Sequence, residues 1–74
     1  MDFEMVQVVS KRVAELGYST TGEAKMRAVF PNGRSCIYDS VPREVFDIVI
    51  SSPSVGSAFG ALIVDGGYPF EYEN

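Results

Sequence analysis

Arginine and tyrosine are the residue types in this chain best suited to hold a ligand, and the ligand they suit is a nucleotide. A guanidinium group pairs with phosphate oxygens through two parallel hydrogen bonds, and an aromatic ring stacks on a base. The free backbone amides at the start of a helix attract the same anionic group. The candidate ligand-binding residues that meet one of these conditions are Arg27, Arg34, Arg43, Tyr18, Tyr38 and Ser54.

Each candidate also has a purely structural explanation, which the sequence leaves open. Tyr38 falls on an apolar strand face, where it can be a core residue. Arg34 follows a predicted turn and can be an ordinary solvated turn residue. Ser54 can serve only as a helix cap, because serine is a preferred N-cap residue.

The residues that carry the commonest catalytic chemistry are missing from the sequence. It contains no histidine, which is the most frequent general base and metal ligand. Cys36 is the only cysteine, so it has no partner for a disulfide or a zinc site, and we expect it to be a buried strand residue. The serines lack a G-x-S-x-G context, and the glycine-rich stretches match neither a P-loop nor a dinucleotide fingerprint. We therefore expect a non-enzymatic protein with no catalytic residues, no metal and no cofactor.

Charge and composition narrow the class of partner. The formal net charge of −4 argues against duplex DNA, because that binding depends on neutralising many phosphates. All six basic residues lie at or before Arg43, so the first half can still carry a local basic patch. A hydrophobic content of 46% in 74 residues leaves apolar surface for a partner, and we expect a homo-oligomer. The sequence shows no secretory leader and no apolar run of membrane-span length, so we expect a soluble cytoplasmic protein without membrane contact.

The elements that must position these residues centre on a β-hairpin. Residues 26–30 and 34–38 read as two strands, joined by the three-residue loop Pro31-Asn32-Gly33. Proline presets φ at the first loop position and glycine takes the left-handed position that completes the bulge. The loop fixes the register, so that Ala28 faces Cys36. The residues expected on one shared core face are Met26, Ala28, Phe30, Cys36 and Tyr38.

The segment before the hairpin fits two structures. Residues 3–9 are rich in β-branched residues and predict a strand. The apolar residues of 3–16 also recur at near-helical spacing, and Gly17 would end such a helix. Periodicity alone leaves the choice between strand and helix open.

Two helices are predicted after the hairpin. The first runs from Pro42 to about Ser51 with Ser40 as its N-cap, and the second begins after Ser54. Gly56 and Gly60 lie inside the second helix, where each costs about 1 kcal/mol relative to alanine, so we expect close packing against them. Residues 68–72 form an aromatic tail, packed on the core or carried to a neighbour.

Several motifs of this chain, taken together, resemble the KTSC domain. They are Ser10-x-x-Val13-x-x-Leu16-Gly17-Tyr18, then Phe30-x-Asn32-Gly33-x-x-Cys36-x-Tyr38-x-x-Val41-Pro42-x-x-Val45-Phe46, and Ser52-x-Ser54-x-Gly56-x-x-Phe59-x-x-x-Ile63-x-x-x-Gly67-Tyr68-Pro69. The resemblance covers about residues 8–70. This family is named for a domain at the C-terminus of some lysyl-tRNA synthetases and also occurs as small stand-alone proteins in bacteria and phages.

The resemblance implies a single α+β domain over residues 1–74, with a small antiparallel meander of three or four strands covered by two C-terminal helices. It favours strands at 3–8 and 12–18 over the helical alternative. It also implies RNA binding, which has been suggested for the family. Two positions depart from the family pattern: Cys36 stands where relatives have the first tyrosine of a Tyr-x-Tyr pair, and Gly60 follows Phe59 where relatives have asparagine.

Two functions of different classes follow as expectations. The first is a binding module for a nucleotide-type ligand, either an RNA segment or a small signalling nucleotide sequestered by a phage-type homo-oligomer. The second is a protein–protein interaction module or small inhibitor that docks by its apolar sheet face or its aromatic tail.

Overall fold

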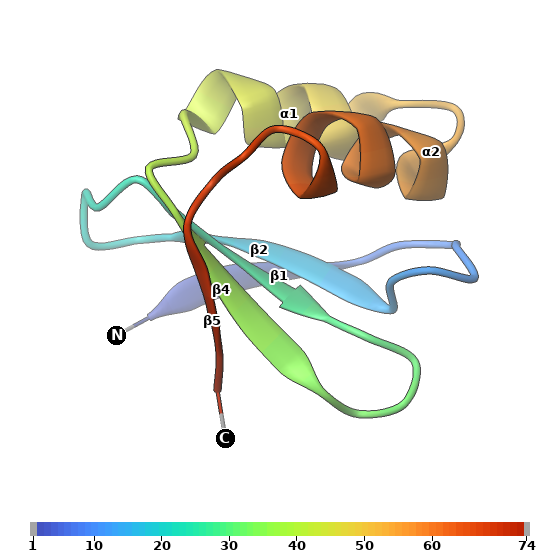
Figure 1. Cartoon of the computed structure of the whole chain (residues 1–74), viewed down its shortest axis with the longest axis horizontal. Helices are drawn as coiled ribbons and strands as arrows, with labels where there is room; N and C mark the ends of the chain where they lie inside the picture. The colour runs from blue at the N-terminus through green and yellow to red at the C-terminus, as the bar shows by residue number, and fades with distance from the viewer. Residues whose placement is uncertain (1, 74) are drawn as a thin grey trace.

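The chain folds as an antiparallel meander of five strands with a helical layer on one face (Figure 1). The structure, a computed structural model, describes residues 2–73. The strands are β1 (Phe3–Gln7), β2 (Glu15–Ser19), β3 (Lys25–Val29), β4 (Ser35–Asp39) and β5 (Phe70–Tyr72), and they lie side by side in that order. The helical segments are α1 (Arg43–Ser51), α2 (Val55–Phe59) and the π-helical η1 (Gly60–Val64). The expected α+β class with two C-terminal helical elements is confirmed.

The predicted hairpin is present with the predicted register. Ala28 pairs with Cys36 and Met26 with Tyr38. The loop is closed by the Phe30 amide, which donates to the Arg34 carbonyl at 2.8 Å. Gly33 has φ of 87°, which is the left-handed conformation that the loop requires.

The first half of the chain forms strands, so the helical alternative for residues 3–16 is wrong. β1 occupies residues 3–7, close to the predicted 3–8. β2 starts at Glu15, whereas we predicted a strand over 12–18. The preceding residues instead form a bend, in which the Arg12 amide donates to Ser10 Oγ at 3.1 Å. The Ala14 amide donates to the Val29 carbonyl at 2.7 Å, so the ladder to β3 begins there.

The start of α1 differs from the prediction in its cap. Pro42, and not Ser40, is the N-cap residue, and no side chain caps the helix. Ser40 has φ of 62° and its amide donates to Asp39 Oδ1 at 2.8 Å. Ser40 therefore turns the chain out of β4 and lies too early to reach the first amides of the helix.

The second helix is continuous from Val55 to Val64 but widens in its second half. The Asp65 amide donates to the Gly60 carbonyl at 3.0 Å, which is an i→i+5 bond. Phe59 and Ile63 point from this helix into the core, with 2% and 1% of their surface exposed.

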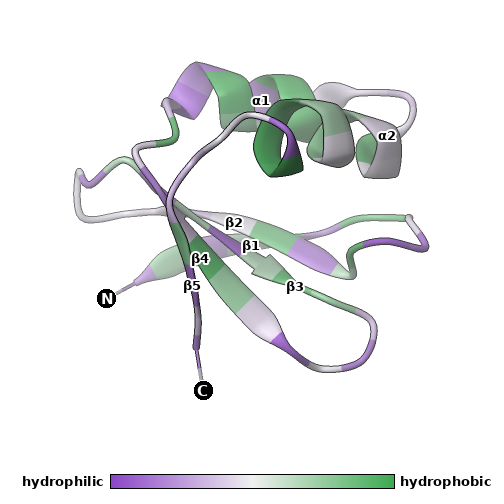
Figure 2. Ribbon diagram, viewed as in Figure 1, coloured by the Kyte–Doolittle hydropathy of each residue, from purple (hydrophilic) through white to green (hydrophobic). Residues whose placement is uncertain are grey.

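The core lies between the helices and one face of the sheet. Figure 2 shows hydrophobic residues along both helices and along the central strands, where the two layers meet. Its members are the hydrophobic residues with at most 8% of their surface exposed: Val13, Leu16, Tyr18, Met26, Ala28, Cys36, Tyr38, Val41, Phe46, Val49, Phe59 and Ile63. The expected core face of the hairpin is confirmed, since Phe30 packs against this cluster.

The sheet has five strands where we predicted three or four. The additional strand is β5, which is formed by the predicted aromatic tail and pairs with β4. Cys36 faces Tyr72 and Tyr38 faces Phe70, so β5 adds two rings to the helix-facing side of the sheet. No helix within residues 2–73 has both the length and the apolar character needed to cross a membrane.

Candidate ligand-binding groove

The six predicted ligand-binding residues lie in four separate places, described in turn below. Tyr18 and Arg43 stack beneath α1, and Arg27 lies on the sheet face opposite the helices. Ser54 lies at the start of α2. Only Tyr38 and Arg34 lie along the same groove, at the end of the sheet near β5. The structure therefore does not join the six into one site.

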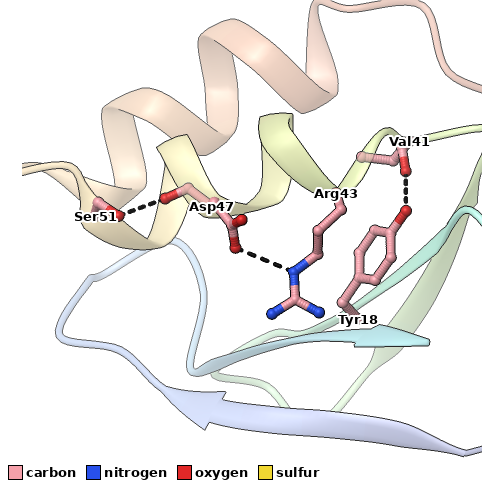
Figure 3. Close-up of polar contacts among 5 residues, drawn as sticks. All are labelled: Tyr18, Val41, Arg43, Asp47 and Ser51. Carbon is pink, nitrogen blue, oxygen red and sulfur yellow. Dashed lines mark hydrogen bonds and ion pairs between the residues drawn. The ribbon is translucent and has the colours of Figure 1, made fainter. Parts of the chain in front are cut away.

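Tyr18 and Arg43 form a structural contact (Figure 3). The Tyr18 hydroxyl donates to the buried Val41 carbonyl at 2.6 Å, which ties β2 to the entry of α1. The Arg43 guanidinium lies 5.3 Å from the centre of the Tyr18 ring and also pairs with Asp47 at 3.1 Å. Burial raises the pKa of Tyr18, although the charge of Arg43 opposes that rise. The side chains of Tyr18 and Arg43 thus both have their partners within the protein.

Arg27 is also paired within the chain. It forms an ion pair with Glu73, across the reverse face from β3 to the residue after β5, at 2.5 Å. Burial would raise the pKa of Glu73, but hydrogen bonds from Ser35 and Arg27 and the charge of Arg27 outweigh it and lower that pKa. This ion pair thus links the end of β5 to β3 on the sheet face opposite the helices.

Ser54 does not cap the backbone amides of α2. Its hydroxyl is 3.0 Å from the Ser57 hydroxyl, and its carbonyl accepts the Ala58 amide at 3.0 Å. The position at the helix start was predicted correctly, while the side-chain cap is missing.

Five aromatic side chains cluster at the open end of the core, between the second helix and β5. The ring centres of Tyr38 and Phe59 are 5.9 Å apart, and those of Tyr38 and Phe70 are 5.7 Å apart. Phe30 adds an edge contact to Phe59 at 6.2 Å, and Tyr72 lies 6.0 Å from Phe70. These rings enclose a hollow of about 350 Å³ that also contacts Arg12 and Val64. We call it the aromatic groove.

The groove continues into a basic hollow at the hairpin loop. This second hollow, of about 430 Å³, shares Arg12, Phe30 and Tyr72 with the first and adds Lys11 and Arg34. The ion pairs of residues 2–73 are those of Arg27 and Arg43, and neither includes a cation of this hollow. The three cations of the basic hollow are therefore not neutralised by a carboxylate within that part of the chain.

Arg12 reaches the groove because the second helix carries glycine where the arginine crosses it. A Cβ added at Gly60 would overlap the Arg12 guanidinium, and one added at Gly56 would lie 2.6 Å from Ser10 Oγ. The predicted close packing against these glycines is confirmed, and its partner is the loop before β2. Glycine at position 60 thus leaves room for the Arg12 guanidinium.

The phenol at the floor of the groove carries no charge. Burial raises the pKa of Tyr38 to about 12, with smaller contributions from the neighbouring Cys36 thiol and Tyr72. Tyr38 is therefore protonated at any pH near neutral, and it does not repel an anion. Burial likewise raises the pKa of Cys36, which keeps that side chain a neutral thiol.

The reverse face of the sheet, across β3, β4 and β5, carries the opposite charge. A further hollow there, of about 410 Å³, is lined by Asp39, Glu71 and Glu73 with Lys25 as its only cation. An anionic ligand is repelled on this face and attracted at the basic hollow, so the charge pattern favours the side of the sheet that faces the helices.

Of the residues that line this site, sequence reasoning named only Tyr38 and Arg34 as ligand-binding, and it missed among others Lys11, Arg12, Phe70 and Tyr72. Phe70 and Tyr72 were recognised as an aromatic tail but not as a strand beside Tyr38. Gly56 and Gly60 gave the available signal for Arg12, since two glycines one helical turn apart predict that something crosses the helix there. Within residues 2–73, no three His, Cys, Asp or Glu side chains are placed to hold a metal ion.

An antiparallel meander covered on one face by two helical elements makes this protein a small α+β domain. No family model matches the chain, and no curated protein matches it. Among solved structures, a KTSC domain protein from Yersinia pestis superposes with a TM-score of 0.86 at 19% identity, covering 99% of this chain and 100% of that one. The chain therefore has the KTSC domain fold, as its motifs implied.

Proposed function

We propose that this protein is a non-enzymatic binding module that recognises a nucleotide-type ligand, an RNA segment or a small signalling nucleotide, in the aromatic groove. The single observation that carries the proposal is the continuity of the groove: exposed rings at one end run directly into cations without ion-pair partners at the other. A nucleotide has the same two parts, a flat base and an anionic phosphate.

The rings supply the binding energy for a base. Phe70 and Tyr72 expose 59% and 56% of their surface, so a base stacks on them without displacing core atoms. Stacking of a base on an aromatic side chain contributes about 1–3 kcal/mol. Tyr38 and Phe59, which are almost fully buried, form the floor and hold the exposed rings in place.

The cations supply the contacts to phosphate. Lys11, Arg12 and Arg34 surround the basic hollow beside the hairpin loop. The guanidinium of Arg12 is common to both hollows, so it is placed to bridge the base and the phosphate.

The size of the groove favours a compact ligand. A hollow of about 350 Å³ falls at the lower end of the roughly 300–1,000 Å³ typical of small-molecule sites. It is also shallow and open, which suits a free nucleotide or the exposed bases of a single strand. A phage-type homo-oligomer that sequesters a signalling nucleotide fits the same site. The net charge of −4 continues to disfavour duplex DNA.

The test is a titration that compares three single substitutions. Labelled single-stranded RNA and cyclic dinucleotides serve as probes, and fluorescence anisotropy reports binding. Arg12→Gln is expected to weaken binding about tenfold or more, because a charge-assisted contact contributes about 1.5–3 kcal/mol. Tyr72→Ala is expected to weaken it about fivefold or more, because a stacked base contributes about 1–3 kcal/mol. Lys25→Gln is the matched control, since it removes the same charge outside the groove.

Two results would contradict the proposal. One is a failure of every nucleotide probe to bind at millimolar concentration. The other is an equal loss of affinity for Lys25→Gln and Arg12→Gln, which would show that net charge and not the groove determines binding.

A second candidate function is a protein-interaction module, and one observation favours it. The exposed apolar residues Leu62, Val64, Phe70 and Tyr72 extend from the second helix onto β5. The reverse sheet face adds a hollow lined by Phe3, Met5 and Ile37. Capture of one specific protein by these surfaces, with indifference to nucleotides, would favour this function.

A further inference from the structure

The backbone of β1 presents an open hydrogen-bonding edge. Two hydrogen bonds at its ends show which residues of β1 bond to β2. The Thr20 amide donates to the Asp2 carbonyl at 3.0 Å, and the Val8 amide donates to the Ala14 carbonyl at 3.2 Å. Inward bonding alternates along an antiparallel strand, so the even-numbered residues of β1 bond to β2. The amides and carbonyls of Phe3, Met5 and Gln7 therefore point away from the sheet. Within residues 2–73, no strand pairs with them.

The two edges of the sheet differ in how they are protected. β5 is only three residues long and follows Pro69. It contains Glu71, and Glu73 is the next residue after the strand. Short length, proline and charge are the devices that prevent a strand edge from pairing with another chain. β1 is five residues long, contains no proline or lysine and carries the single charge of Glu4. Only β1 thus has the features of a pairing edge.

We propose that β1 pairs with the β1 strand of a second copy of this chain, antiparallel about a two-fold axis at Met5. In this register Met5 lies opposite the partner's Met5. Phe3 lies opposite the partner's Gln7, and Glu4 lies opposite the partner's Val6. Every outward amide and carbonyl of β1 then gains a bonding position, because Phe3, Met5 and Gln7 are the residues whose groups face out.

Charge selects this register over its neighbours. A shift of the axis to Glu4 places that carboxylate opposite the partner's Glu4, and like charges directly opposite destabilise a strand pair. A shift to Val6 leaves Phe3 opposite the partner's Val9, beyond the end of β1. The axis at Met5 is therefore the register that pairs all five residues without opposing two like charges.

The side chains at the centre of β1 are compatible with pairing between two copies of the strand. Met5 is half-buried on the reverse face, where a Cβ at Gly17 would meet its sulfur. Val6, on the helix-facing side, exposes 37% of its surface. Paired in this way, the two copies form one sheet of twice the five strands, with both helical layers on the same side. The aromatic groove lies beside β5 at the far edge, so pairing leaves it open and does not depend on any ligand.

The test uses opposite charges at the centre of the proposed axis. Met5→Lys and Met5→Glu each place two like charges directly opposite one another, so each variant alone is expected to raise the dimer dissociation constant up to about fivefold. Mixed together, the two variants are expected to form a heterodimer, because lysine then opposes glutamate. Sedimentation velocity and light scattering across a range of concentrations measure the masses. Circular dichroism verifies folding, which the long stems of both side chains permit at a half-buried edge.

Amide exchange locates the contact independently of the variants. The amides of Phe3, Met5 and Gln7 are expected to gain protection as the concentration rises, while those of Phe70 and Tyr72 stay unchanged. A wild-type chain that stays monomeric at millimolar concentration would overturn the proposal. So would a dimer whose dissociation constant neither single variant raises, or one that Tyr72→Lys abolishes instead.

Discussion

The hydrogen bond from the Tyr18 hydroxyl tests how much the contact between β2 and the entry of α1 contributes to the free energy of unfolding. It donates at 2.6 Å to the Val41 carbonyl, which belongs to a residue with 0% of its surface exposed. Tyr18→Phe removes the donor and leaves the carbonyl buried without it. Such an unpaired group costs about 1–3 kcal/mol. A chain of 74 residues has a free energy of unfolding of roughly 4–11 kcal/mol, so the expected loss is a large fraction of it.

The matched control is Tyr38→Phe, the same deletion on β4, which β3 separates from β2. Tyr38 is 7% exposed, close to the 8% of Tyr18, and its ring faces the same core. The hydroxyl of Tyr38 has the Cys36 thiol as its neighbour, which is a weak hydrogen-bonding group. Its deletion is therefore expected to cost about 0.5 kcal/mol or less.

Urea denaturation and thermal unfolding, both followed by circular dichroism, measure the two variants under the same conditions. We expect the midpoint of thermal unfolding to fall by roughly 4–24 °C for Tyr18→Phe and by only a few degrees for the control, since ~1 kcal/mol shifts it about 4–8 °C in a domain this small. Equal losses for the two variants, or an unchanged stability for Tyr18→Phe, would refute the reasoning. Affinity for a groove ligand is expected to stay unchanged in Tyr18→Phe, because the groove does not include this residue.

Three further predictions concern the ion pair that links β5 to β3, the packing of Arg12 against Gly60, and the buried thiol of Cys36. Because the pKa of Glu73 is lowered on folding, its ion pair with Arg27 stabilises the protein fully above the ordinary pKa of 4.5 and loses that effect as the pH falls below it. Glu73→Gln is expected to lower the free energy of unfolding by about 0.5 kcal/mol at neutral pH, and urea titrations should show the difference vanish in acid. Gly60→Ala is expected to keep or raise thermal stability by up to about 1 kcal/mol while weakening nucleotide binding in the anisotropy assay, because the new Cβ displaces only the flexible end of Arg12. Cys36, at 1% exposure, should react with a thiol reagent only at the rate of unfolding, and rapid labelling of the native protein at neutral pH would contradict its placement.

The hairpin could be predicted in detail because its information is local. Pro31, Asn32 and Gly33 each restrict their own backbone, and together they specify the loop length and hence the register of the two strands. The burial of Cys36 followed from that register alone. Both features hold in the structure, where Ala28 pairs with Cys36.

The ends of the chain could not be predicted in the same way because their structure depends on distant partners. Residues 70–72 are too few to form a strand by themselves and do so because β4 offers a free edge more than thirty positions earlier. The strand over 3–7 competes locally with a helix, and its pairing with residues 15–19 decides the outcome. In each case tertiary pairing outweighs the local preference.

The candidate site was predicted least well, and for a physical reason. A groove is defined by side chains that meet from separate elements: Arg12 from the bend before β2, the loop cation Arg34, and Phe70 with Tyr72 from β5. The predicted arginines and tyrosines had suitable chemistry, but three of them, Arg27, Arg43 and Tyr18, have contacts inside the fold. Cations whose charge is already balanced by a carboxylate attract a phosphate less than those without such a partner. Lack of an internal partner, which only the structure reveals, therefore distinguishes the residues available to a ligand.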